Sequence, residues 1–191
     1  MTEQLTELDR LVLARWTDAV GLRTALSELE ERLTDRLRIV AERLSPWLES
    51  KGFVSRGVEG KYACINVGRQ SWIKSDDSDR IYISIAALYP FGFRRNEEEH
   101  PYVWVYAYGL SKDEQQSFSD AIRKRLEGKP GGWINDGCDK KAPVGRYIES
   151  YGDPERIELA LSEEKLEAFV KEQLEPILAL AGDLDAALSE V

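Results

Sequence analysis

Residues 5–47 read LTELDRLVLARWTDAVGLRTALSELEERLTDRLRIVAERLSPW, and this stretch decides the fold. Apolar side chains recur there every three or four positions, which places them along one face of a helix. The pattern predicts a long helix over residues 3–50. It forms either one rod or a pair of helices broken near Gly21, because glycine costs about 1 kcal/mol relative to alanine inside a helix. The apolar stripe consists of Leu5, Leu8, Val12, Trp16, Ala19, Leu22, Leu26, Leu29, Leu33, Leu37, Val40, Leu44 and Trp47.

A stripe of this length has to be covered by another apolar surface. One candidate is the protein's own sheet together with its last helix, since a helix generally buries its stripe within its own domain. The other is a second copy of the chain, paired through the N-terminal helix as a coiled-coil-like homodimer. Both alternatives are compatible with the sequence.

The segment 53–110 has a different period, because apolar and polar residues alternate there with a repeat of about two. Three stretches rich in β-branched and aromatic residues, Gly60 to Val67, Ile81 to Leu88 and Tyr102 to Leu110, are separated by turn-forming residues. Short connections between neighbouring strands favour antiparallel pairing. The segment therefore predicts an antiparallel β-meander.

The remaining chain predicts two more helical regions around an irregular connection. Ser111 and Glu114 have the spacing of a capping box, so we expect a helix over 111–128. Residues 129–161 are expected to be an irregular connection, in which 153–161 fits either a short helix or an edge strand. A C-terminal helix is expected over 162–190, with a kink at Pro176. The whole is predicted to be one α+β domain in which an antiparallel sheet of about four strands packs against the long N-terminal helix and the C-terminal helix.

Composition restricts the class of protein. The chain has 191 residues, 42% of them hydrophobic, and a net charge of −9. Its last 39 residues hold 11 acids and 3 bases, so a partner with a basic surface is conceivable. No apolar run is long enough to cross a membrane and no signal peptide is recognisable, so a cytoplasmic location is expected. With one histidine and two distant cysteines, Cys64 and Cys138, neither a zinc site nor a cofactor is predicted.

Two aromatic segments are the first candidate contact sites. Alternation places Tyr102, Trp104, Tyr106 and Tyr108 on one face of a strand, where they can stack on a ligand or grip a partner's side chains. The alternative is a central strand that helices cover on both faces. The second segment is a connection whose aromatic and arginine residues are typical of interface anchors, or else plug one end of the core. Its candidate partner-binding residues are Tyr89, Phe91, Phe93, Arg94 and Arg95.

The segment 123–146 is locally basic and is the candidate surface for nucleic acid. Its proposed contacts are Arg123, Lys124, Lys140 and Lys141. The same cations can instead pair with the acidic C-terminal segment. Cys138 lies near two lysines, which can lower the pKa of a thiol, and His100 is the only histidine able to act as its base. The acidic runs 76–79 and 97–99 are expected to be solvated loops, because consecutive residues seldom converge on one metal ion.

Glu59-Gly60-Lys61 resembles the Glu-x-Lys motif of PD-(D/E)xK nucleases, and the order of helix, meander and helix is similar to theirs. The resemblance implies a magnesium-dependent nuclease, although glycine replaces the usual apolar middle residue and no acid-bearing strand precedes the motif. The leading prediction is a non-enzymatic protein-binding module, such as a regulator, an inhibitor or a subunit of a larger assembly. The alternative is a nucleic-acid-acting, nuclease-like domain.

Overall fold

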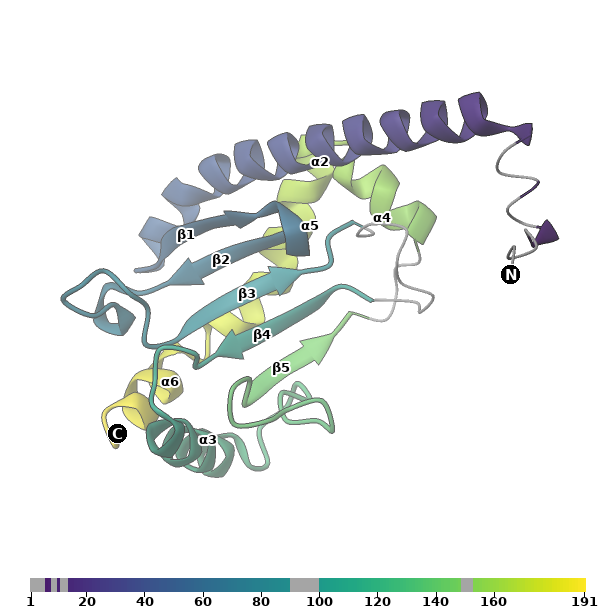
Figure 1. The fold of residues 1–191 in the computed structure, drawn as a ribbon. Helices are drawn as coiled ribbons and strands as arrows, with labels where there is room; N and C mark the ends of the chain where they lie inside the picture. Colours follow the sequence, from purple (N-terminus) through teal and green to yellow (C-terminus); the bar gives the residue numbers. More distant parts are fainter. Residues whose placement is uncertain (1–5, 8–9, 11–13, 90–99, 149–152) are drawn as a thin grey trace.

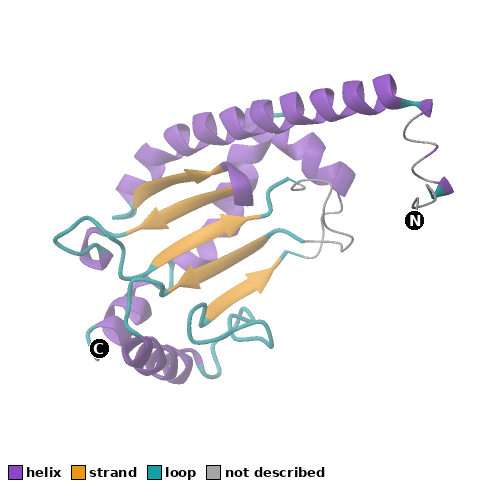
Figure 2. Cartoon of the chain, in the orientation of Figure 1, coloured by secondary structure: helices purple, strands orange, loops and turns teal. Residues whose placement is uncertain are grey.

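The computed structural model describes residues 6–7, 10, 14–89, 100–148 and 153–191. It confirms an α+β fold with an antiparallel sheet, which has five strands where about four were expected (Figures 1 and 2). The strands follow one another in chain order across the sheet: β1 (Val54–Glu59), β2 (Cys64–Gly68), β3 (Tyr82–Ala86), β4 (Tyr102–Tyr106) and β5 (Val144–Tyr147). The helices are α2 (Trp16–Ser50), α3 (Lys112–Leu126), α4 (Asp153–Ala160), α5 (Glu163–Leu178) and α6 (Ala181–Leu188), with single 3-10 turns at Gly60–Tyr62 and Gln70–Trp72.

The long helix α2 is continuous through Gly21, and its apolar stripe divides into a buried half and an exposed half. Leu33, Leu37, Val40, Leu44 and Leu48 are at most 3% exposed and face the sheet and α5. Toward the N-terminus, Trp16 is 60% and Leu22 is 62% exposed. A helix of 35 residues is roughly 50 Å long, whereas strands of this length span about 17–20 Å. The N-terminal half of α2 therefore extends beyond the sheet (Figure 1).

One face of the sheet forms the core with α2 and α5. Ile65, Ile83, Ile85, Val103 and Val105 point to this side and are fully buried. No helix in the described part of the chain lies over the opposite face, which is turned toward the viewer in Figure 1. We call it the helix-free face. The expectation that helices cover β4 on both faces is not met.

The connection 129–161 contains a strand that was not expected, β5. It also contains the helix α4, which agrees with the alternative of a short helix over 153–161, so the alternative of an edge strand there is wrong. The C-terminal helix is interrupted between α5 and α6, shortly after Pro176. The missing N–H of Pro176 removes one hydrogen bond inside α5, which still continues to Leu178 before the break. The capping box of α3 is confirmed, because Ser111 N donates to Glu114 and Glu114 N donates to Ser111 Oγ.

The helix α6 is fixed to the connection between β2 and β3 by a single carboxylate. Asp185 Oδ1 accepts hydrogen bonds from Trp72 Nε1 at 2.7 Å and from Ser71 Oγ at 3.3 Å, while Asp185 Oδ2 lies 2.5 Å from Arg69. Trp72 is fully buried and packs edge-on against Phe53, with ring centroids 5.8 Å apart. Asp185 therefore joins two segments more than 100 residues apart. None of the described helices combines the length and the apolar character that a membrane crossing requires.

Candidate functional site: an aromatic layer on the helix-free face

The helix-free face carries aromatic residues from three neighbouring strands. Alternation along β4 turns Tyr102, Trp104 and Tyr106 toward this face, because Val103 and Val105 fill the core. The strand register places Tyr82 of β3 opposite Tyr106, and Tyr147 of β5 opposite Tyr102. Tyr108 follows β4 directly. We call these six residues the aromatic layer: Tyr82, Tyr102, Trp104, Tyr106, Tyr108 and Tyr147.

The rings of the aromatic layer form two groups. In the first, Tyr106 stacks on Tyr108 at 5.2 Å with an interplanar angle of 11°, and lies 5.4 Å from Tyr82. In the second, Tyr147 meets the Trp104 ring edge-on at 5.7 Å and the Tyr102 ring at 6.3 Å. Such edge-on and offset pairs are the favourable arrangements of aromatic rings. A hydrogen bond between the side chains of Tyr102 and Tyr106 links the two groups.

Exposure rises from the middle of the layer to its ends. Trp104 is 5% exposed, whereas Tyr108 is 56% and Tyr147 is 51% exposed. A side chain at Gly145 or Gly137 would collide with Trp104, since a Cβ atom there would lie 2.5 Å and 3.0 Å from its ring. The indole thus packs directly on the backbone of β5 and of the loop before it. Trp104 is the buried centre of the layer, and Tyr108 and Tyr147 are its most exposed members.

Two phenols of the layer, Tyr82 and Tyr106, have a raised pKa. Burial raises the pKa of Tyr106 above its ordinary value, and the proximity of Tyr102 and a hydrogen bond with it raise the pKa further. Burial also raises the pKa of Tyr82, with a smaller contribution from the negative charge of Glu59. The hydroxyl groups of Tyr82 and Tyr106 therefore remain protonated and can donate as well as accept hydrogen bonds.

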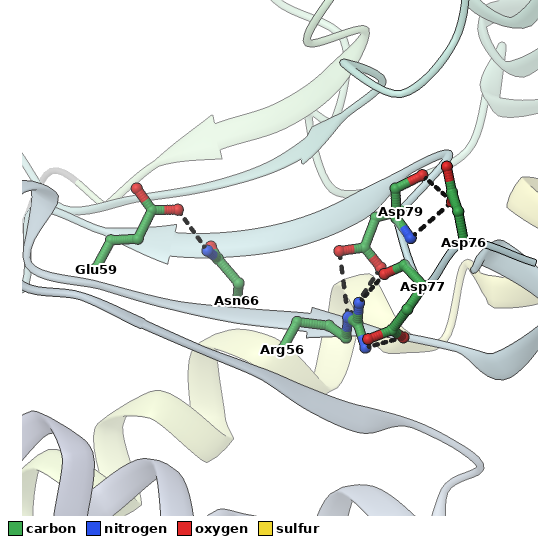
Figure 3. A network of polar contacts seen from close by, with 7 residues as sticks. Arg56, Glu59, Asn66, Asp76, Asp77 and Asp79 are labelled. Atoms are coloured by element: carbon green, nitrogen blue, oxygen red, sulfur yellow. Dashed lines mark hydrogen bonds and ion pairs between the residues drawn. The ribbon is translucent and has the colours of Figure 1, made fainter. Parts of the chain in front are cut away.

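Acidic and amide groups lie on β1, on β2 and in the turn before β3 (Figure 3). The charge of Glu59 acts on Tyr82 of the layer. Asn66, 8% exposed, donates from Nδ2 to Glu59 Oε1 at 3.0 Å. Arg56 donates to the carbonyl oxygen of Asp77 at 2.7 Å and pairs with the carboxylate of Asp79 at 3.0 Å. The acidic turn 76–79 is therefore partly a structural clamp for Arg56 rather than only a solvated loop. Within the described ranges, no three His, Cys, Asp or Glu side chains are grouped so that they could hold a metal ion.

The two residues of the nuclease-like motif have separate surroundings. Glu59 is held by Asn66, and the Lys61 Nζ lies 5.3 Å from the centre of the Tyr62 ring. The described residues bring no pair of further acids to Glu59. The geometry of this part of the chain therefore adds nothing to the resemblance.

The predicted contact loop after β3 is only partly described. Tyr89 is 1% exposed, and its hydroxyl lies 2.8 Å from Thr34 Oγ1 of α2. It is therefore a core residue. Phe91, Phe93, Arg94 and Arg95 lie outside the described residues, so the prediction of a partner contact rests on these four.

The basic segment is partly neutralised by the C-terminal helices. Arg125 pairs with Glu190, and the Lys129 Nζ lies 2.6 Å from Asp183 Oδ2. Arg123 donates to the carbonyl oxygen of Cys138 at 3.0 Å. Lys124, Lys140 and Lys141 are exposed. Two cations of the segment, Arg125 and Lys129, therefore pair with the acidic C-terminal segment, as the second alternative predicts.

The cysteines have the properties of structural thiols. Burial raises the pKa of Cys138, and this effect outweighs the lowering effect of Arg123. Burial also raises the pKa of Cys64. Cys138 Sγ lies 3.6 Å from the carbonyl oxygen of Trp133 and 3.5 Å from the amide of Asn135. The expected lowering of the Cys138 pKa is therefore not found.

Sequence reasoning found four of the six aromatic residues but missed Tyr82 and Tyr147. Tyr82 lies within a predicted strand, so its alternation with Ile81 and Ile83 was an available signal. Tyr147 belongs to a four-residue strand with no clear pattern of its own. Compared with known proteins, the chain matches no family model, no curated protein and no solved structure, so its function has to be inferred from its own residues.

Proposed function

We propose that the protein is a non-enzymatic protein-binding module whose contact surface is the aromatic layer. The observation that carries this proposal is the gathering of six aromatic rings on the helix-free face in two packed groups of three, with Tyr108 and Tyr147 more than half exposed. Tyrosine and tryptophan are enriched at the energetic centres of protein interfaces, because they bury a large area and keep a polar group for hydrogen bonding. Rings that are already packed lose little conformational entropy on binding.

The acidic groups on the β1 side of the layer favour a partner with a basic surface there, whereas Lys74, whose Nζ donates to the Gly109 carbonyl oxygen at 2.6 Å, lies beside Tyr108. Glu59, Asp76 and Asp77 are exposed, and the chain carries a net charge of −9. In the described part of the chain, Arg56 is engaged by the acidic turn, and no ion pair joins Glu59 to a lysine or arginine. Cations are also attracted to the faces of tyrosine and tryptophan rings. A nucleic-acid partner is less well supported by the net charge of −9, although three of its four candidate contacts, Lys124, Lys140 and Lys141, are exposed.

The proposal is tested with the Tyr108→Ala and Tyr147→Ala variants. A partner is first identified by affinity capture and purified, and its dissociation constant is then measured by calorimetry. Each substitution is expected to weaken binding by about tenfold or more, as the truncation of an aromatic anchor usually does. The control is Tyr62→Ala, which removes a 49% exposed tyrosine outside the layer and is expected to leave the constant unchanged. The proposal is refuted if the double variant Tyr108→Ala/Tyr147→Ala binds the partner as tightly as the wild-type chain does. Turnover of a substrate by the purified chain would also refute it.

The protruding half of α2 is the second candidate contact surface, and its proposed occupant is a second copy of the chain. This pairing is proposed because Trp16 and Leu22 are exposed, and a solvent-exposed apolar stripe on a helix is typical of coiled-coil pairing. Light scattering coupled to size exclusion is expected to give twice the chain mass of 21.7 kDa at high concentration. Leu22→Glu should return the monomer, while Leu161→Glu, at a 43% exposed leucine elsewhere, should not. A wild-type monomer at every concentration rules out the pairing.

A further inference from the structure

A hollow of about 450 Å³ lies between the C-terminal end of α3 and the glycine-rich loop that follows it. Its wall combines apolar side chains with three cations. The lining includes Arg123, Lys124, Leu126, Lys129, Trp133 and Ile134. The volume lies within the range of pockets that bind small molecules, roughly 300–1,000 Å³.

The polar groups of this hollow are mainly hydrogen-bond donors. Arg123 Nε is buried and has no acceptor among the described residues, whereas Arg123 Nη2 donates to the Cys138 carbonyl oxygen and Lys129 pairs with Asp183. Trp133 is 5% exposed, and its indole N–H is not among the buried unpaired atoms of the described residues. Lys124 is exposed at the rim, and Glu127 is the one acidic side chain among the lining residues. Because a buried donor without a partner is costly, an acceptor group bound in the hollow would recover this free energy.

The loop backbone allows this arrangement. Gly131 and Gly132 both have left-handed conformations, with φ of +118° and +62°. A side chain at Gly131 would overlap the indole, since its Cβ would lie 2.4 Å from Trp133 Nε1. The position of Trp133 is also fixed from β5, because Gly145 N donates to the Trp133 carbonyl oxygen at 2.9 Å. The indole is therefore held in the wall of the hollow on two sides.

The local charge is positive although the chain as a whole is acidic. The cations are Arg123, Lys124, Lys129 and Arg146, whose guanidinium group lies 4.9 Å from the centre of the Trp133 ring. The anions facing them are Glu127 and Asp183, and Asp183 is paired with Lys129. A local excess of positive charge attracts anions and raises their concentration near the site.

We propose that this hollow binds a small organic anion, in which a carboxylate or phosphate group is attached to a flat apolar body. The oxyanion accepts hydrogen bonds from the indole of Trp133 and from Arg123, with Lys124 supplying charge at the rim. The apolar body lies against Leu126, Ile134 and the indole ring. This site is independent of the aromatic layer, so either proposal can fail without the other.

Calorimetry of the full chain tests the site with phenyl phosphate, benzoate, inorganic phosphate and phenol as probes. At least one of the two aryl anions is expected to bind, and more tightly than inorganic phosphate, while neutral phenol does not bind. Lys124→Glu is expected to weaken binding of the aryl anion by about tenfold or more, since charge-assisted hydrogen bonds are the strong ones. Trp133→Phe keeps the ring but removes the N–H, and should weaken binding by about three- to tenfold.

The matched control is Lys140→Glu, which makes the same change of charge in the same basic segment but outside the lining of the hollow. It is expected to leave the affinity nearly unchanged. The proposal is overturned if neither aryl anion binds, if Lys140→Glu weakens binding as much as Lys124→Glu, or if phenol binds as well as phenyl phosphate. Lys124 is exposed, so its variant should fold even if Trp133→Phe does not.

Discussion

Replacing Leu37 with alanine is expected to lower the free energy of unfolding by roughly 2–5 kcal/mol, the usual cost of removing a buried leucine side chain. Leu37 is fully buried in the half of α2 that faces the sheet. Its truncation leaves a cavity that the surrounding helix and strands can fill only partly, because the packed core is rigid. Urea denaturation followed by circular dichroism measures the change.

The matched control for Leu37 is Leu22→Ala on the same helix. Leu22 is 62% exposed, so its truncation should change the free energy of unfolding by less than about 0.5 kcal/mol. The measurement is made at a concentration where the chain is monomeric, so that pairing of α2 does not contribute. Similar losses for both variants would mean that the two halves of α2 are equally buried in solution, contrary to the division described above.

This division of α2 could not be predicted from its sequence. The apolar stripe has the same spacing from Leu22 to Leu29 as from Leu33 to Leu44, so the pattern indicates a helix along its whole length. What the stripe contacts depends on the length of the strands beside it. Five-residue strands can cover only part of a 35-residue helix. The sequence therefore predicted the helix correctly. Whether the sheet or a second copy of the chain covers its apolar stripe depends on tertiary structure.

The strand β5 shows a second limit of sequence reasoning. Its residues Val144–Tyr147 are too few for alternation to be recognised, and it pairs with β4 across a connection of more than 30 residues that contains α3. Pairing at that distance depends on the tertiary fold rather than on a local turn. The strand was missed for that reason, and Tyr147 was missed with it.

The aromatic layer was predictable along one strand but not across strands. Alternation in β4 correctly indicated a common face for Tyr102, Trp104 and Tyr106. Whether that face is covered depends on where the helices pack, and the neighbours of each ring depend on the register of β3 and β5. Neither property is encoded in the pattern of a single strand. The same limit applies to the anion-binding hollow, whose indole and cations meet only through the loop after α3.

Replacing Asp185 with alanine is expected to destabilise the protein by about 2–3 kcal/mol. The largest part comes from Trp72, which is fully buried and whose indole N–H donates to Asp185 Oδ1 at 2.7 Å. Without an acceptor, a buried N–H of this kind costs about 1–3 kcal/mol. The ion pair with Arg69 adds little, because both side chains are about one-third exposed and solvent screens the pair.

Two further variants separate these contributions in thermal and urea unfolding. Asp185→Asn keeps an acceptor for the indole but removes the charge, so it should lose less than half as much stability as Asp185→Ala. In a Trp72→Phe background the indole N–H is absent, and Asp185→Ala should then cost less than about 1 kcal/mol, which is the non-additivity expected of residues in direct contact. Equal losses in both backgrounds would show that the Trp72 hydrogen bond does not hold α6 in place. The carboxylate would then act only through Arg69 and Ser71, and α6 would depend mainly on its apolar contacts with α3.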